Sequence, residues 1–218
     1  MADQNPTEVA SDGSALLRNE PVQARSTARL ASLLDAAATI IDEIGYERLT
    51  TAMVAERAGA SIGTVYRYFP DRIVVLQSLS ARSLGGFVEG TRMTILDPAH
   101  TTWWDAVGAC IVGMTTAFRS LPGFRSLRLG DVLDVRPALS AQSGSTVVAA
   151  AAATALSERF GLPIEELAHR LEVVIVVCDS LLSRAFTYDS TGDSKLIDEA
   201  MTISKAYMTG FYGDPGTS

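Results

Sequence analysis

The chain has 218 residues, of which 47% are hydrophobic and 20% charged, and its formal net charge at pH 7 is -7. This length and apolar content are enough for a substantial core, either as one domain or as a small domain joined to a larger one. The acidic balance argues against a protein that coats nucleic acid indiscriminately, although it leaves room for a local basic face.

Nothing in the sequence indicates a membrane or secreted protein. The longest apolar run, at residues 173–178, is far shorter than the roughly 20 residues that a spanning helix needs. The polar N-terminus lacks a secretory signal, and both cysteines lie within apolar runs, which is typical of buried thiols in a reduced compartment. We therefore expect a cytoplasmic protein without a membrane partner.

The N-terminal third differs from the rest in charge and in pattern. Between residues 18 and 82 there are eight arginines and seven acidic residues, whereas most of the remaining acids lie after residue 88. Residues 1–24 lack hydrophobic periodicity, so a disordered arm is predicted there. From Thr27, apolar residues recur at a spacing of three or four and predict an amphipathic helix that ends at Gly45.

Two short helices are predicted next. Thr50 is placed to cap the first, which Gly59 closes, and Ser61 is placed to cap the second, which Pro70 stops. The residues predicted to face inward are Met53, Val54 and Ala58 in the first and Ile62, Val65 and Phe69 in the second.

The short connection "AGAS" between these helices is typical of a helix-turn-helix, with the preceding long helix as a brace. The opposite face of the second short helix then presents Ser61, Gly63, Thr64 and Arg67, with Tyr66 and Tyr68 beside them. Short hydroxyls and one long cation at a helix N-terminus favour an anionic partner, and a glycine lets the partner approach the backbone closely.

This glycine-rich, basic stretch has two other possible interpretations. A nucleotide phosphate loop does not fit, because the G-x-x-x-x-G-K-[ST] pattern is absent and no strand precedes the glycines. A purely structural hairpin is the remaining alternative. It would have no need to place Tyr66, Arg67 and Tyr68 in succession beside Thr64.

The stretch from Leu33 to Arg72 resembles the TetR family of bacterial transcriptional regulators. The family pattern has a small pair in the first helix, a Gly-aromatic at its end, a capping Thr, an Ala-Gly-x-Ser turn, a Gly-Thr-x-Tyr and a Tyr-Phe. Here these fall at Ala36 and Ala37, Gly45 and Tyr46, Thr50, Ala58 to Ser61, Gly63 to Tyr66, and Tyr68 and Phe69. The resemblance implies an all-α fold, with a helix-turn-helix DNA-binding head over 25–72 and a helical ligand-binding and dimerisation domain over 73–218.

The resemblance also implies roles for single residues. Thr50, Tyr66 and Arg72 would contact phosphates, and Ser61, Thr64 and Arg67 would lie in or beside the major groove. Arg25 and Arg29 would reach the DNA backbone or the minor groove, or else are a solvated helix start. The chain departs from the family at Ala52 and Met53, where polar or basic residues are common, so the predicted phosphate contacts are few.

Beyond residue 72 the pattern predicts a helical bundle. The predicted helices cover 72–93, 103–121, 136–160, 164–188 and 194–212, with a short segment at 123–131. The segment 164–188 is apolar nearly all round at its centre and must be covered on all faces, which favours a subunit interface over burial within one monomer. The resemblance implies dimerisation through 164–188 and 194–211, so that two heads would read two half-sites of a palindrome.

A ligand site is predicted among the aromatic residues of the middle helices. Its candidate residues are Phe87, Trp103, Trp104, Phe118, Arg119 and Phe124. Such a lining would suit a small lipophilic effector, and ordinary core packing is the alternative interpretation. No cofactor is expected, and no metal, because neither histidine has a partner at metal-ligand spacing. Redox sensing is not expected either, because neither cysteine has the neighbouring cations that lower the pKa of a thiol.

The resemblance thus implies a one-component transcriptional regulator, a repressor by the family's prevailing mode, that binds a double-stranded operator as a homodimer and is released by a small molecule. An enzyme is not expected, because no catalytic constellation occurs at an identifiable spacing. The alternative is a helical dimer that binds another protein and has lost DNA binding.

Overall fold

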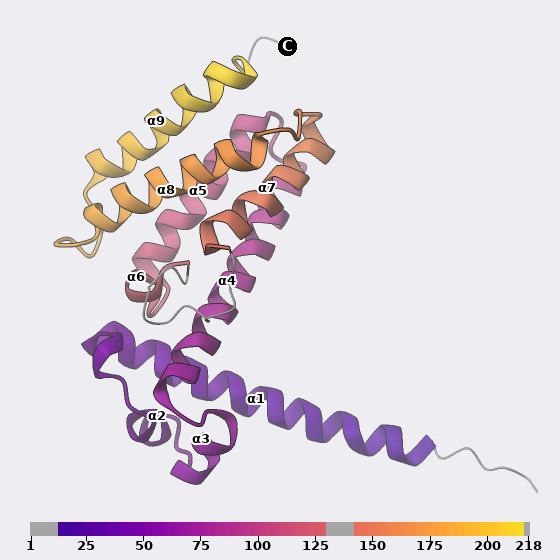
Figure 1. Cartoon of the computed structure of the whole chain (residues 1–218), viewed down its shortest axis with the longest axis vertical. Coiled ribbons are helices and arrows are strands. Elements are labelled where there is room, and N and C mark those ends of the chain that lie inside the picture. Colours follow the sequence, from indigo (N-terminus) through magenta and orange to yellow (C-terminus); the bar gives the residue numbers. More distant parts are fainter. Residues whose placement is uncertain (1–12, 130–141, 216–218) are drawn as a thin grey trace, which may run out of the picture.

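The computed structural model describes residues 13–129 and 142–215, and within these ranges all regular structure is helical, as predicted. A small head of three helices lies at one end, and a long helix runs from it into a bundle (Figure 1). The helices are α1 (Gly13–Ile44), α2 (Thr51–Arg57), α3 (Ile62–Tyr68), α4 (Arg72–Leu96), α5 (Trp103–Ser120), α6 (Phe124–Leu127), α7 (Gly144–Phe160), α8 (Leu167–Ala185) and α9 (Ser194–Tyr212), and a 3-10 turn covers Tyr46–Arg48.

The head has its own core. Leu33, Ala37 and Ile41 lie four residues apart on α1 and are at most 1% exposed. They belong to the same buried cluster as Val54 of α2 and Val65 of α3, both fully buried. Seven-residue helices are too short to be stable alone in water, so α2 and α3 depend on this packing.

The first helix is longer than predicted. Its backbone is helical from Gly13, so residues 13–24 continue α1 rather than forming an arm, and residues 1–12 of the predicted arm lie outside the described residues. Extending an existing helix costs much less than nucleating one, so a helix anchored by its packed part continues beyond the core. The predicted end is confirmed, because α1 stops at Ile44 and Gly45 takes a φ of 83°.

The predicted burial of one residue of α3 is wrong. Val65 and Phe69 are buried as expected, but the side chain of Ile62 is 43% exposed. Ile62 is the first residue of α3 and follows directly on the exposed Ser61, at the rim of the head. The three-residue spacing places it on the inner side of the helix, but the head core does not extend far enough to cover it.

Helix α4 connects the two parts of the protein. Asp71 caps its start, since the Asp71 Oδ1 accepts two backbone N–H bonds from the first turn, at 2.8 and 3.0 Å. Val75 and Leu79 of α4 lie in the head core, whereas Ile95 lies in the core of the bundle. Because α4 is continuous, a change in its direction moves the head relative to the bundle.

The bundle packs α7 between α4 and α8, with α9 on the outer side of α8 (Figure 1). Ala149, Ala152 and Ala153 of α7 are buried, and their small side chains allow neighbouring helices to approach closely. Helix α7 begins at Gly144, later than the predicted 136, and residues 130–141 lie outside the described residues. In the described ranges, no helix is both long and apolar enough to cross a lipid bilayer.

A second link between head and bundle comes from the short helix α6. Phe124 lies in the core of the bundle, but Leu127, one turn later, lies in the core of the head. The turn before α6 fits closely against α1, because a Cβ on Gly123, with its φ of 75°, would come within 3.3 Å of the Ala38 carbonyl oxygen. Movement of the bundle relative to the head therefore meets resistance at α6 as well as at α4.

Candidate nucleic-acid interface and apolar cavity

Two hydroxyls are held at the start of α3. The Ser61 Oγ accepts a hydrogen bond from the Thr64 backbone N–H at 3.1 Å and lies 2.9 Å from the Thr64 Oγ1. The predicted cap is thereby confirmed, and the same contacts fix the orientation of both side chains. Ser61 is exposed and Thr64 half-buried, so the pair forms a polar edge at the surface of the head.

The middle of α3 offers its backbone and a tyrosine to solvent. Gly63 is exposed, and the nearest atom to a Cβ placed on it is the Ser61 Oγ, at 3.9 Å. Nothing inside the molecule therefore requires a glycine there. Tyr66 is 53% exposed and outside the core cluster of the head. This face of α3 is free for an external partner.

Tyr68 has an intramolecular contact that the sequence did not indicate. Its hydroxyl lies 3.1 Å from the Ser26 Oγ of α1, and this hydrogen bond lowers the pKa of the phenol. The guanidinium of Arg67 lies 5.3 Å from the centre of the Tyr68 ring. Tyr68 thus joins the end of α3 to α1 and helps to position Arg67.

Three arginines line an open groove between α1 and α3. They are Arg25, Arg29 and Arg67, and the remaining lining residues are Ser26, Ala28, Ser32 and Tyr68. No acidic side chain in the described part of the chain forms an ion pair with any of the three. In a protein with a net charge of -7, this groove is a local concentration of positive charge.

The remaining predicted phosphate contacts lie at the start of α2 and of α4. The Thr50 Oγ1 accepts the Met53 N–H at 3.2 Å, which confirms the predicted cap. The Arg72 Nη1 donates to the carbonyls of Glu47 at 3.0 Å and Tyr46 at 3.5 Å, and so holds the 3-10 turn in place. Both side chains are exposed, and each has a structural contact besides its predicted phosphate contact.

An ion pair that sequence reasoning missed braces the head. Arg57 of α2 meets Glu43 of α1 through two hydrogen bonds, Nη1 to Oε1 at 2.9 Å and Nη2 to Oε2 at 2.7 Å. The pair holds the pKa of Glu43 below its usual value. The two residues are 14 positions apart, so helical periodicity could not have indicated the contact.

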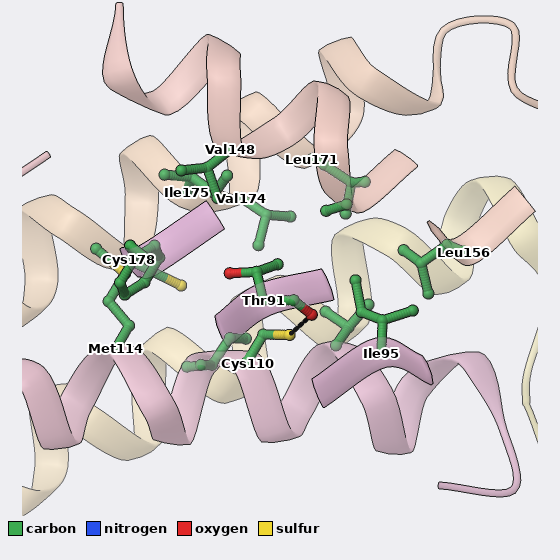
Figure 2. A pocket seen from close by; sticks show the side chains of 14 residues that line it. Thr91, Ile95, Cys110, Met114, Val148, Leu156, Leu171, Val174, Ile175 and Cys178 are labelled. Carbon is green, nitrogen blue, oxygen red and sulfur yellow. Dashed lines mark hydrogen bonds between the residues drawn. The ribbon is translucent and has the colours of Figure 1, made fainter. Parts of the chain in front are cut away.

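A small cavity of about 50 Å³ lies in the bundle between α4, α5, α7 and α8 (Figure 2). Its lining is apolar apart from Thr91 and two thiols. The lining residues are Phe87, Thr91, Ile95, Val107, Cys110, Ile111, Met114, Val148, Ala152, Leu156, Leu171, Val174, Ile175 and Cys178. The cavity therefore suits an apolar group.

Both thiols at this cavity are shielded. Burial raises the pKa of Cys110 to about 12, and its Sγ lies 3.9 Å from the Thr91 carbonyl oxygen, along the dashed line in Figure 2. Burial also raises the pKa of Cys178, whose Sγ lies 3.3 Å from the Ser204 Oγ. Neutral thiols are poor nucleophiles.

Of the six predicted ligand residues, only Phe87 lines this cavity. Trp103, Phe118 and Phe124 are buried in the core of the bundle, where Phe118 packs edge-on against Phe124 at 5.3 Å. Trp104 is half-buried against Trp103, and Arg119 donates from Nε and Nη2 to the Thr191 carbonyl. Ligand contact by these six side chains stays a prediction. In the sequence, the aliphatic residues that line the cavity cannot be distinguished from aliphatic residues of an ordinary core.

Two family matches cover the two parts of the chain. Residues 33–77 match the bacterial regulatory proteins of the tetR family, and residues 101–212 match the tetracyclin repressor-like C-terminal domain. A segment of 50 residues is 44% identical to the HTH-type transcriptional repressor KstR of Rhodococcus jostii and covers 23% of this chain. The match spans only 24% of that repressor's length.

Solved structures share the architecture. A TetR-family transcriptional regulator from Streptomyces coelicolor is 28% identical, with 84% of this chain and 98% of that chain covered at a TM-score of 0.70. The regulator FadR from Bacillus subtilis, solved with stearoyl-CoA, is 18% identical with 83% and 98% covered at a TM-score of 0.60, a likeness of fold alone. Because the C-terminal match alone covers more than half of the residues and the head matches separately, the chain belongs to the TetR family of bacterial regulatory proteins.

Proposed function

We propose that the protein is a one-component transcriptional repressor that binds a palindromic operator as a homodimer and is released by a small lipophilic effector. The observation that carries this proposal is the exposed face of α3 beside the arginine groove, on a chain that is acidic overall. Repression, rather than activation, is favoured by the 44% identity of a 50-residue segment to the KstR repressor. We place the protein in the cytoplasm, where it would meet DNA.

The face of α3 divides into base contacts and phosphate contacts. Ser61, Thr64 and Arg67 would read base edges in the major groove, and Gly63 would let the backbone approach. Tyr66 would contact a phosphate. Hydroxyls whose orientation is already fixed lose little entropy on binding, which favours their use in recognition.

Phosphate contacts come from several elements. Arg25 and Arg29 of α1 lie beside Arg67 across the open groove, so one DNA strand along this groove would meet three cations. Thr50 and Arg72 would add contacts at the starts of α2 and α4. Helix α2 itself contributes little, because Ala52 is exposed but apolar and Met53 is half-buried. We therefore expect a modest non-specific affinity.

The outer faces of the last two long helices favour a homodimer. Val176 of α8 is 50% exposed, and Ile203 and Phe211 of α9 are 42% and 51% exposed. Large apolar side chains exposed together on adjacent helices indicate a protein interface. They fall within the predicted interface segments 164–188 and 194–211. A two-fold pairing through α8 and α9 would place two heads on successive half-sites of one palindrome.

An effector would act through the connection between bundle and head. The apolar cavity adjoins α4, and α4 enters the head core. An effector that fits one direction of α4 better than another changes the separation of the two recognition helices, and its differential affinity sets how far the equilibrium moves. We therefore expect the protein to bind its operator more weakly in the presence of the effector.

Fluorescence anisotropy with duplex DNA from the region flanking the gene, at two salt concentrations, tests the DNA-binding part. Tight binding that falls steeply with salt, and that Tyr66→Ala and Arg67→Ala both weaken, is expected. Arg92→Ala, on the exposed side of α4, is the matched control for Arg67→Ala.

The alternative function is a protein-interaction module that has lost DNA binding, which the apolar Ala52 and Met53 favour. Absence of binding at low salt, or binding that neither α3 substitution changes, would reject the DNA-binding proposal in favour of this alternative.

A further inference from the structure

The cavity in the bundle is too small for an effector of ordinary size. It measures about 50 Å³, whereas a dry cavity that binds benzene measures about 150 Å³, and pockets for drug-sized molecules measure about 300 to 1,000 Å³. A ligand that enters must therefore find additional space beyond the present lining.

Such space lies in a groove on the surface where the head meets the bundle. Its walls come from α1, from α4 and from the turn between α5 and α6. The lining residues are Asp35, Ala38, Thr39, Leu79, Arg82, Ser83, Gly86, Phe87, Leu121 and Pro122. The groove is mostly apolar, and its charged groups are the ion pair between Arg82 and Asp35, with Nη1 to Oδ1 at 2.8 Å.

Phe87 is the one described residue that lines both the groove and the cavity. Its side chain is half-buried and stacks on Phe124 with ring centres 5.9 Å apart. The backbone beside it is uncrowded, since a Cβ on Gly86 or Gly90 would have no neighbour within 4 Å. Because Phe87 lines both hollows, rotation of its ring would join the cavity to the groove, at the cost of its stacking on Phe124.

We propose that the cavity and the groove are two ends of one ligand site, with Phe87 as the gate between them. The occupant is an amphiphile. Its unbranched hydrocarbon tail passes Phe87 into the cavity, and its head accepts hydrogen bonds from Arg82. A carboxylate is the head group that binds Arg82 most tightly. This inference rests on the proposed function and specifies the class of its effector.

The chemistry of each end supports this orientation. The cavity offers aliphatic side chains and two neutral thiols, which suit a hydrocarbon and no charged group. In the groove, the Arg82 Nη1 donates to Asp35 and to the Ala31 carbonyl, and the Nε and Nη2 donors form no hydrogen bond with a described residue. Guanidinium groups bind carboxylates through paired donors, so Arg82 has donors available for a second acceptor.

The same position connects the ligand to the head. Asp35 belongs to α1 and Arg82 to α4, so their ion pair is one of the contacts that hold α4 against the head. A ligand carboxylate would compete with Asp35 for Arg82. Binding would then weaken a bond between α1 and α4 in addition to filling space beside α4.

Isothermal titration calorimetry with the full-length protein and two probes, n-decanoate and decan-1-ol, tests this site. We expect decanoate to bind more tightly than decanol, and Arg82→Met to remove most of that difference. Shorter and longer alkanoates should show a gain of about threefold to fourfold per methylene. The gain should level off once the tail has filled the space beyond Phe87.

Two adjacent glycines provide a matched pair of variants. Both Gly85 and Gly86 are exposed within α4 and have no neighbour within 4 Å of a Cβ, but only Gly86 lines the groove. Gly86→Trp should weaken decanoate at least about tenfold by filling the groove, and Gly85→Trp should leave affinity unchanged. Phe87→Ala, which joins the two hollows, should speed association in stopped-flow measurements.

The outcomes separate this inference from the proposed function. No binding of either probe to the wild type, or equal effects of the two tryptophan variants, would overturn it. If Ala152→Phe, which fills the cavity, abolishes binding while Gly86→Trp has no effect, the cavity remains an effector site but the route past Phe87 is wrong. If decanoate binds as expected and DNA affinity does not change, the proposed ligand site is supported, but the proposal that an effector of this class releases the protein from DNA is rejected.

Discussion

The replacement of Gly63 by alanine separates the stability of the head from its binding of DNA. Gly63 lies in the first turn of α3 and is exposed, and a Cβ placed on it would meet the Ser61 Oγ at 3.9 Å as its nearest neighbour. Alanine is a better helix former than glycine, so Gly63→Ala should raise the free energy of unfolding by up to about 1 kcal/mol. If Gly63 faces a DNA backbone or base edge, the added methyl group should at the same time weaken binding.

The size of the binding loss follows from the close approach of two surfaces. An extra methyl group in a packed contact costs about 1 to 3 kcal/mol. A homodimer carries the substitution in both heads, so the loss is about 2 to 6 kcal/mol, which corresponds to a Kd at least about thirtyfold weaker. The expected result is therefore a more stable protein with a much lower operator affinity.

Urea denaturation at fixed protomer concentration and fluorescence anisotropy with operator DNA measure the two quantities. Gly85→Ala is the control, because Gly85 is also helical, exposed and without neighbours but lies on α4. Gly85→Ala should stabilise the protein as much as Gly63→Ala does, and it should leave the affinity for DNA unchanged. A loss of stability in Gly63→Ala would mean that the head itself needs this glycine, and unchanged DNA binding would mean that the start of α3 does not contact DNA.

Three further predictions concern the contacts that hold the head and bundle. Asp71→Ala removes the cap that accepts two N–H bonds at the start of α4, so the free energy of unfolding in urea should fall by about 1 kcal/mol and Asp71→Ser should restore most of it. Because the pKa of Glu43 is lowered in the folded state, its pair with Arg57 stabilises the protein at pH values above the ordinary carboxyl pKa, and this stabilisation is lost as the pH falls through the lowered pKa. The difference in stability between wild type and Glu43→Gln, measured by thermal unfolding, should therefore be largest near neutral pH and vanish in acid. Replacement of Phe118, which is 1% exposed, by alanine should lower the free energy of unfolding by about 3 to 5 kcal/mol, as measured by chemical denaturation.

Each of these has a result that would contradict it. Equal stability of Asp71→Ala and wild type would mean that the start of α4 is held by other contacts. A stability difference at Glu43 that persists in acid would assign it to packing rather than charge. A Phe118→Ala variant that loses little stability but loses effector binding would return Phe118 to the predicted ligand site, with Met93→Ala, at a 58% exposed position, as the control for an exposed apolar residue.

Local structure followed from the sequence because its causes lie within a few residues of one another. The caps at Thr50 and Ser61 and the left-handed Gly45 depend only on the side chain and the backbone of the next turn. The buried stripe of α1 follows from helical periodicity for the same reason. The head was therefore predictable nearly residue by residue, and the resemblance to the TetR family added roles that periodicity alone does not contain.

Long-range contacts were not predictable in this way. Periodicity indicates that a helix face is buried but not which segment covers it, nor where the cover ends, so Ile62 was assigned to the core although the head stops short of it. The same limit applies to Leu127, which belongs to the head core although it follows α5 of the bundle by sequence. The pairing of Arg57 with Glu43 depends on the crossing of two helices.

The amino-acid sequence alone was enough to specify an all-helical protein with a helix-turn-helix head, because capping, turns and amphipathic spacing are local properties of the chain. The space left in the bundle, by contrast, depends on how the helices pack in three dimensions. A cavity is what remains when side chains from four helices fail to meet, so aliphatic residues that line it look the same in sequence as those that fill a core. For the same reason, the packed structure was needed to show that Phe87 lines both this cavity and a groove at the junction with the head.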